Sequence, residues 1–466
     1  MKPRTTLILF VALIGIGLFY YLWGVKGEAQ REARQERQNR ILPMLETGEV
    51  NRVELVQGGD TSVVYERVDG TWQITAPVQT QPDTSNLTSN LETFLEAEKK
   101  RTITTELTDL QPYGLDKPQA RIGIAYRDTG KATLLVGDET PTASGIFVKL
   151  EEKPAIYTAG NNIQTEGTKG LFDLRDRSIV HFDRNRISRI VLDRGEGRSL
   201  EFTKFGNDWR LEDPNVRVQN SAVNRILRDL SNNKFQDVVQ ETPENLTEYG
   251  IDEPSITVSL FSDDTTRDAV LKLGESAEDS DSPEYYARDL ARPMIFTIRN
   301  DLVTQLQKSP FEFQNKQLFD VNRNQITDVE ISWNDTTYTV SKVDTVWKMT
   351  APVEQPVRES PVQSITRDLS SIRVDELASY ERTSPALYGL DEPWLRVIMK
   401  VSGSEYDGFT VGDTTDLSMR YITTDSSPYV YKIEENKLED FQISAGSLAQ
   451  EKTIAEDTSE VSLEIE

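Results

Sequence analysis

The sequence YGLDKP at residues 113–118 returns as YGIDEP at 249–254 and as YGLDEP at 388–393. The tyrosines lie 136 and 139 residues apart (249 − 113 and 388 − 249). A tryptophan precedes each copy and a strand-ending glycine follows it, both at intervals of 137 and 138 residues: Trp72, Trp209 and Trp347; Gly137, Gly274 and Gly412. Three landmarks that share one period predict a threefold internal duplication.

Each copy predicts the same order of secondary structure. Alternating apolar positions open each copy and indicate a half-buried strand: Val53 and Leu55, Ile190 and Leu192, Val329 and Ile331. An apolar stripe at helical spacing follows each tryptophan: Leu87, Leu91, Phe94 and Leu95; Val223, Ile226, Leu227 and Leu230; Val362, Ile365, Leu369 and Ile372. Alternation returns after each turn: Ile122, Ile124 and Tyr126; Ile256, Val258 and Leu260; Leu395, Val397, Met399 and Val401. The fold class is therefore α+β, with a mostly antiparallel sheet and a helix in each of three homologous repeats.

The repeated turn is explained by turn chemistry. Its residues in the three copies are Tyr113, Gly114, Asp116 and Pro118; Tyr249, Gly250, Asp252 and Pro254; Tyr388, Gly389, Asp391 and Pro393. Glycine permits a positive φ, aspartate bonds nearby amides, and proline fixes an extended start to the next strand. Tyrosine packs on the sheet with its hydroxyl near water. We interpret the turn as structural, in preference to a ligand-gripping loop.

Composition limits the classes of function. The 466 residues suffice for about three domains, and 37% hydrophobic with 28% charged residues is typical of a folded body. A net charge of −25 disfavours nucleic acid as a partner. The chain has no cysteine and one histidine, so disulfides, thiolate sites and multi-histidine zinc sites are excluded. No cofactor is predicted.

An uncharged apolar run occupies residues 5–25. At 1.5 Å per residue it spans roughly 31 Å, the thickness of a hydrocarbon core. Its bulky C-terminal end lacks the small residues of a signal-peptide cleavage site, so we predict an uncleaved transmembrane anchor. Cationic residues flank both ends, with more after the run than before it. We still expect a cytoplasmic N-terminus and a periplasmic or otherwise extracytoplasmic body, because the run opens the chain like an export signal.

The predicted organisation has six parts. They are a cytoplasmic tip and transmembrane anchor (1–25), a helical juxtamembrane stem (26–47), repeat domains at 48–183, 184–321 and 322–445, and an acidic disordered tail (446–466). The partners predicted from this organisation are inner-membrane lipid, through the N-terminal helix, and other envelope proteins.

Catalytic and metal-binding motifs are not found. His181 follows the first copy, and we pair it with Phe319 of the second, which favours packing over catalysis. The acidic clusters Asp263-Asp264 and 275–284 lack EF-hand spacing and sister runs, so they read as solvated loops rather than calcium sites. No nucleophile elbow, Walker loop or dinucleotide fingerprint occurs, and we predict a non-enzyme.

The chain resembles the bacterial family catalogued as domain of unknown function 4340. The resemblance rests on the N-terminal apolar run, the Y-G-L-D-x-P turns, WQITAPV at 72–78, WKMTAPV at 347–353, LVGDETP at 135–141 and FDLRDR at 172–177. It covers essentially the whole body. Two departures are noted: Glu212-Asp213-Pro214 replaces T-A-P in the middle copy, and the last copy lacks a clear F-D-L-R-D and ends in Asp440-Phe441-Gln442.

The resemblance implies an accessory role beside ABC-type transporter components of the gliding-motility sort, and it implies no catalytic residue. Our leading hypothesis is a membrane-anchored extracytoplasmic binding or scaffolding protein. The alternatives are an envelope enzyme that acts on glycan or peptide, and a structural spacer.

Overall fold

The computed structural model describes residues 39–58, 61–106, 108–195, 197–263, 267–277, 283–402, 406–415 and 418–449. The predicted anchor, residues 26–38 of the predicted stem and the chain after residue 449 lie outside these ranges. Within them, no helix has both the length and the apolar character needed to cross a membrane. The chain divides after Ser178 into two compact units, and the second holds repeats two and three.

The first domain is an eight-stranded sheet in the order β3-β2-β1-β5-β6-β7-β8-β4. Its strands are β1 (Val50–Gln57), β2 (Thr61–Val68), β3 (Thr71–Ala76), β4 (Arg101–Thr104), β5 (Ala120–Tyr126), β6 (Gly130–Glu139), β7 (Ile146–Leu150) and β8 (Ile156–Ala159). Its helices are η2 (Thr47–Glu49), α3 (Thr84–Leu95), η3 (Gln111–Tyr113), α4 (Asn162–Gly167) and α5 (Leu171–Leu174).

The second domain is a nine-stranded sheet in the order β12-β11-β10-β9-β14-β15-β16-β17-β13. Its strands are β9 (Arg189–Asp193), β10 (Leu200–Phe205), β11 (Asp208–Leu211), β12 (Val216–Arg217), β13 (Val238–Gln240), β14 (Ile256–Phe261), β15 (Arg267–Ala277), β16 (Glu284–Asp289) and β17 (Ile295–Arg299). Its helices are α6 (Asn220–Asn232), η4 (Thr247–Tyr249), α7 (Asn300–Leu306) and α8 (Pro310–Phe313).

The third domain repeats that order as β21-β20-β19-β18-β23-β24-β25-β26-β22. Its strands are β18 (Ile326–Trp333), β19 (Thr336–Val343), β20 (Val346–Ala351), β21 (Gln355–Pro356), β22 (Glu376–Ser379), β23 (Leu395–Val401), β24 (Tyr406–Thr414), β25 (Met419–Thr424) and β26 (Val430–Glu434). Its helices are η5 (Arg323–Gln325), α9 (Glu359–Ser371), η6 (Pro385–Tyr388), η7 (Glu435–Phe441) and α10 (Ala445–Leu448).

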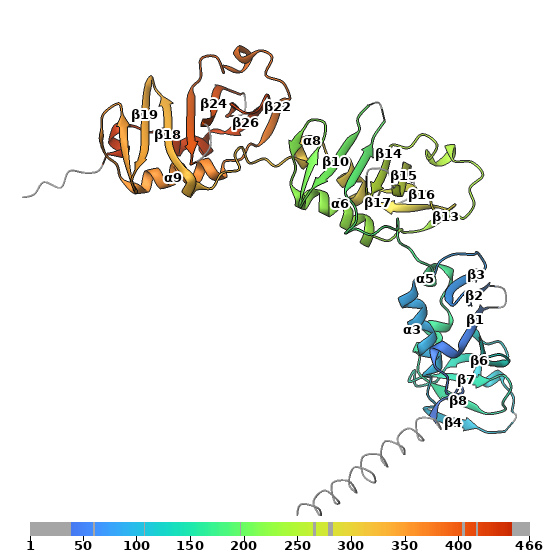
Figure 1. Cartoon of the computed structure of the whole chain (residues 1–466). Coiled ribbons are helices and arrows are strands. Elements are labelled where there is room, and N and C mark those ends of the chain that lie inside the picture. The colour runs from blue at the N-terminus through green and yellow to red at the C-terminus, as the bar shows by residue number, and fades with distance from the viewer. Residues whose placement is uncertain are drawn as a thin grey trace, which may run out of the picture. The chain divides into compact units, whose positions relative to one another are not determined.

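Neighbouring strands are antiparallel in all three sheets of the described chain, which confirms the predicted α+β repeats. In each domain one long helix packs across a face of the sheet (Figure 1). The predicted helical stripes of α3, α6 and α9 are buried, as are the alternating residues that open each copy. Burial of these apolar surfaces is the main term that stabilises each domain.

The two ends of the described chain extend the cores beyond the predicted domain limits. Ile41, Leu42 and Leu45 were assigned to the stem, yet they are buried in the core of the first domain. At the other end, Leu448 was assigned to the tail and is fully buried in the core of the third domain. The predicted stem and tail therefore contain residues that complete folded domains.

Candidate functional site

The repeated turn and the strand glycine contact one another in every domain. Gly137, Gly274 and Gly412 each lie so close to the carbonyl oxygen of the turn tyrosine that an added Cβ atom would overlap it. The turn glycines Gly114, Gly250 and Gly389 have φ values of 65°, 64° and 63°, as predicted for that position. Backbone therefore packs on backbone here, and only glycine fits on the strand.

The turn tyrosines and Asp252 contact neighbouring residues of their own domain. Each turn tyrosine is half-buried and packs edge-on against one ring, with centroids 5.0–5.1 Å apart: Tyr113 on Phe147, Tyr249 on Tyr286 and Tyr388 on Tyr421. Asp252 accepts hydrogen bonds from the Thr247 hydroxyl at 2.7 Å and then from the Glu253 amide at 3.0 Å, and both lower its pKa. Asp116, Asp391 and Pro393 are exposed, whereas Pro118 and Pro254 are half-buried.

The three tryptophans lie at equivalent places in the hairpins β2–β3, β10–β11 and β19–β20, and their burial differs. Trp209 is 1% exposed, and its indole N–H donates to Asn224 at 3.3 Å. Trp72 and Trp347 are half-buried. Trp72 packs edge-on against Tyr65 at 5.4 Å and lies under the Arg67 guanidinium at 4.7 Å. These contacts are packing contacts of the kind expected at a sheet–helix border.

Each domain closes with a one-turn helix that we call the clasp (residues 170–175, 309–314 and 444–449). The clasp forms an antiparallel bridge with the residues just before the long helix: Pro82 with Arg175, Val218 with Gln314, and Val357 with Ala449. In the third domain the amide of Arg358 donates to the carbonyl of Leu448 at 2.9 Å. The last copy lacks the sequence F-D-L-R-D, as expected, yet AGSLA at 445–449 forms the same helix and bridge as LFDLR at 171–175.

A second short segment, here called the incoming segment, enters the first and third domains in the same way. In the first domain it is residues 39–42: the Ile41 amide donates to Ala97 O at 2.9 Å, and the Lys99 amide donates to Asn39 O at 2.7 Å. In the third domain it is residues 316–319, where the Leu318 amide donates to Ile372 O at 3.0 Å.

One residue, Asn315, lies between the clasp of the second domain and the incoming segment of the third. We call residues 313–318 the connector. The amide of Asn315 donates to Arg217 O of the second domain at 2.8 Å. The carbonyl of the next residue, Lys316, accepts from the Val374 amide of the third domain at 2.9 Å. No linker residue separates the two sets of hydrogen bonds.

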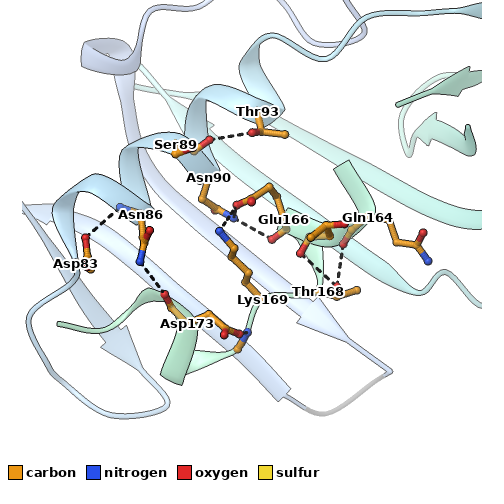
Figure 2. A network of polar contacts seen from close by, with 12 residues as sticks. Asp83, Asn86, Ser89, Asn90, Thr93, Gln164, Glu166, Thr168, Lys169 and Asp173 are labelled. Carbon is orange, nitrogen blue, oxygen red and sulfur yellow. Dashed lines mark hydrogen bonds and ion pairs between the residues drawn. The ribbon is translucent and has the colours of Figure 1, made fainter. Parts of the chain in front are cut away.

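A polar network joins α3 to α4 in the first domain, and Figure 2 shows Asn90 facing Glu166 and Lys169. The Tyr65 hydroxyl donates to the Asn90 side-chain oxygen at 2.8 Å. The Asn90 amide nitrogen donates to the Glu166 carboxylate and carbonyl, both at 2.9 Å, and Lys169 pairs with that carboxylate at 2.7 Å. Tyr65 and Asn90 are fully buried. Burial, followed by the negative charge of Glu166, raises the pKa of Tyr65, so its phenol stays protonated.

The same positions are apolar in the other two domains. The strand registers place Phe202 and Val340 at the position of Tyr65. Helical spacing places Ile226 and Ile365 at the position of Asn90, and all four are buried. The network fixes α4 against α3, and its buried tyrosine and asparagine are closed to a substrate.

The structure corrects the predicted pairing of His181 with Phe319. Counting forward from the clasp bridges pairs Val180 with Phe319, each 3% exposed, and pairs His181 with Asp320. His181 and Asp320 are both exposed. The histidine is therefore a surface residue, and its sister position is polar.

The acidic clusters show no convergence in the part of the chain that the structure describes. Asp264 and residues 278–282 lie outside the described residues. Among those described, no three histidine, cysteine, aspartate or glutamate side chains gather closely enough to hold a metal ion.

One carboxylate pair with altered titration lies in the third domain. Asp368 of α9 faces Asp440 of η7, and Arg367 lies 3.4 Å from the first carboxylate and 3.7 Å from the second. Burial raises the pKa of Asp368, and the hydrogen bond with Asp440 and its negative charge act in the same direction. Nothing in the sequence pattern pointed to this pair, because its members lie on different elements.

Cavities in the described part of the chain accompany these features. Two lie in the first domain, about 600 and 780 Å³ in volume, and both are lined by Arg40, Glu92 and Glu96. A third of about 310 Å³ is lined by Trp347 and Glu359 in the third domain. A smaller one, about 160 Å³, lies beside the connector.

Comparison with known proteins identifies a family pattern. A family model described as Domain of unknown function (DUF4340) matches residues 72–215, 209–346 and 347–463. The three matches begin at Trp72, Trp209 and Trp347, which confirms the period predicted from the landmarks. No curated protein and no solved structure matches the chain.

Proposed function

This chain belongs to the family described as domain of unknown function (DUF4340), and we propose that its three domains form a membrane-anchored scaffold outside the cytoplasm. The apolar run at residues 5–25 would hold it in the inner membrane as a single pass with a cytoplasmic N-terminus. The body would bind other envelope proteins, and an ABC-type transport system is the partner that we propose.

The connector carries this proposal. Asn315 bonds to the second domain and Lys316 to the third, so consecutive residues belong to different domains. Domains joined by a free linker would move independently, which is the default for separate domains. When each of two consecutive residues is hydrogen-bonded to a different domain, the chain is suited to holding the binding surfaces of those domains at a set spacing.

Capture from native membranes tests the proposal. The full chain is crosslinked in cells and affinity-purified, beside a variant with four glycine and serine residues inserted between Asn315 and Lys316. We expect a membrane transport protein to be enriched with the native chain and to be reduced with the variant. A matched insertion between Glu152 and Lys153, in the exposed turn between β7 and β8, is expected to leave the enrichment unchanged.

Recovery of proteins in proportion to their abundance would contradict the proposal. The alternative of an envelope enzyme is favoured by one observation, the carboxylate pair of Asp368 and Asp440. Replacement of Asp440 by asparagine distinguishes the two, because a scaffold keeps its cellular function and an enzyme that uses this pair loses it.

A further inference from the structure

The cavity beside the connector combines parts of the second and third domains. Its volume is about 160 Å³. It is lined by Arg217 of β12, by connector residues from Gln314 to Leu318, and by the turn that joins β25 to β26. That volume is below the roughly 300 Å³ of a site for a drug-sized ligand, so it suits one small unit of a larger molecule.

The charge of the lining is positive although the chain is acidic. Arg217 and Lys316 are the two charged residues of the lining, and both are cations, in a chain of net charge −25. Arg217 pairs with Asp320 at 2.6 Å, but the Asp320 side chain is 82% exposed. An exposed pair of this kind is worth little, so an anionic ligand could replace the aspartate.

The rest of the lining is hydroxyl, amide and aromatic. Thr424, Ser426 and Ser427 contribute hydroxyl groups, and Tyr429 contributes a half-buried ring. Gln314 is 6% exposed and donates its amide nitrogen to the Tyr431 hydroxyl at 2.6 Å. Its amide oxygen is buried without a hydrogen-bond partner in the described chain, which is costly for a polar atom.

The second domain fills the equivalent place with an ion pair. Sheet register pairs Asp289 with Thr424, and the same turn then pairs Arg292 with Ser427. Arg292 bonds to Asp289 at 2.9 Å and donates to the carbonyl of Ile179 at 2.7 Å. The third domain has two short hydroxyl side chains instead of these long ones, which leaves room for a ligand.

We propose that this cavity binds one saccharide unit that carries a carboxylate. Saccharide hydroxyls donate and accept, so they match the amide and hydroxyl lining. The Tyr429 ring offers an apolar face, and the two cations attract the carboxylate. This inference deepens the proposed binding function and rests on it for the idea that the ligand is part of an envelope polymer.

Saturation-transfer NMR with glucuronate tests this site, with glucose as the matched neutral probe. The full chain is used in a detergent that has no sugar headgroup. We expect saturation transfer to glucuronate and roughly tenfold weaker binding of glucose, because a charged hydrogen bond contributes at least that factor. The double variant Thr424→Asp with Ser427→Arg recreates the ion pair of the second domain and is expected to abolish the signal.

A second variant tests the cavity without changing the turn between β25 and β26. Arg217→Gln is expected to weaken glucuronate binding roughly tenfold. Arg210→Gln, on the exposed neighbouring strand, is the matched control and should bind normally. Absence of saturation transfer, equal binding of glucose, or unchanged binding by both altered cavities would overturn the inference. Capture of a transport protein could still succeed in that case, so the failure of this site and the failure of the scaffold are distinguishable.

Discussion

The turn–glycine contact is the same in all three domains, whereas a buried position on the long helix differs in chemistry between them. Gly137, Gly274 and Gly412 meet a tyrosine carbonyl in all three domains. By contrast, the buried position on the long helix is Asn90 in the first domain and isoleucine in the other two. The fold is the same in each case.

The difference separates two kinds of constraint. Where backbone approaches backbone, one residue type fits and no partner can adapt. Where side chains pack, the chemistry can change if the partners change together, as the positions of Tyr65 and Asn90 do in the other two domains. We therefore expect single changes to be costly at both places and a concerted change to be tolerated only at the helix face.

Gly137→Ala should have the largest effect. The new methyl group would overlap the carbonyl oxygen of Tyr113, and relief requires movement of backbone. We expect a loss of about 3 kcal/mol or more in the stability of the first domain. Hydrogen-exchange mass spectrometry of peptides from β6 measures this loss in the full chain.

Gly123→Ala is the matched control within the same sheet. A Cβ atom there lies 3.7 Å from its nearest neighbour, which is ordinary contact. We expect it to be neutral or slightly stabilising, since alanine loses less entropy on folding. Equal effects of the two substitutions would show that backbone contact does not determine the glycine.

Asn90→Leu should follow in size. It removes the acceptor of the Tyr65 hydroxyl and a donor to the Glu166 carboxylate, and both groups remain buried or half-buried. We expect a loss of about 2 to 3 kcal/mol, seen as faster hydrogen exchange in α3. Exchange as slow as in the native chain would contradict a structural role for the network.

Tyr65→Phe combined with Asn90→Leu should cost less than Asn90→Leu alone. The pair imitates the second domain, where Phe202 and Ile226 occupy these two positions and are both fully buried. Replacing both partners by apolar groups of similar shape is close to neutral. If the double variant were less stable than Asn90→Leu, the helix face would tolerate a concerted change no better than a single one.

Asp368→Asn should have the smallest effect, and the effect should depend on pH. The folded pKa of Asp368 is raised, so its contribution to stability is fully present below the unfolded pKa and is lost as pH rises through the folded pKa. Asparagine should therefore stabilise the third domain at neutral pH, with a gain that disappears in acid. Thermal unfolding at several pH values measures it.

Asp229→Asn is the control for that substitution, at the equivalent place in α6. Asp229 lies 3.4 Å from Arg225 and 3.5 Å from Arg228 rather than beside a second carboxylate. Neutralising it should slightly destabilise the domain. A gain at neutral pH for both variants would show that Asp440 is not the cause.

Local periodicity made much of the fold predictable. The strands predicted from the alternation at Val53, Ile190 and Val329 are found where expected, and so are the helices predicted from the stripes at Leu87, Val223 and Val362. These elements present an apolar face with a regular period, which is the signal that a sequence carries most directly.

Features that depend on distant partners were not predicted. Ile41 and Leu42 look like part of a charged stem, because the core that buries them and the residues 97–99 that hydrogen-bond to their segment lie far along the chain. The register of His181 was misjudged by one residue, since loop lengths shift the interval between copies from 136 to 139. The network of Tyr65, Asn90 and Glu166 joins three elements that no single period links.

Hydrogen exchange at the incoming segments tests the repeated docking most directly. The amides of Ile41, Lys99, Leu318 and Val374 donate across the two equivalent junctions at 2.7 to 3.0 Å. In the full chain we predict that all four exchange as slowly as amides within the sheets. Exchange at the rate of an unfolded chain at either junction would contradict a scaffold in which the first and third domains are completed by the segments that precede them.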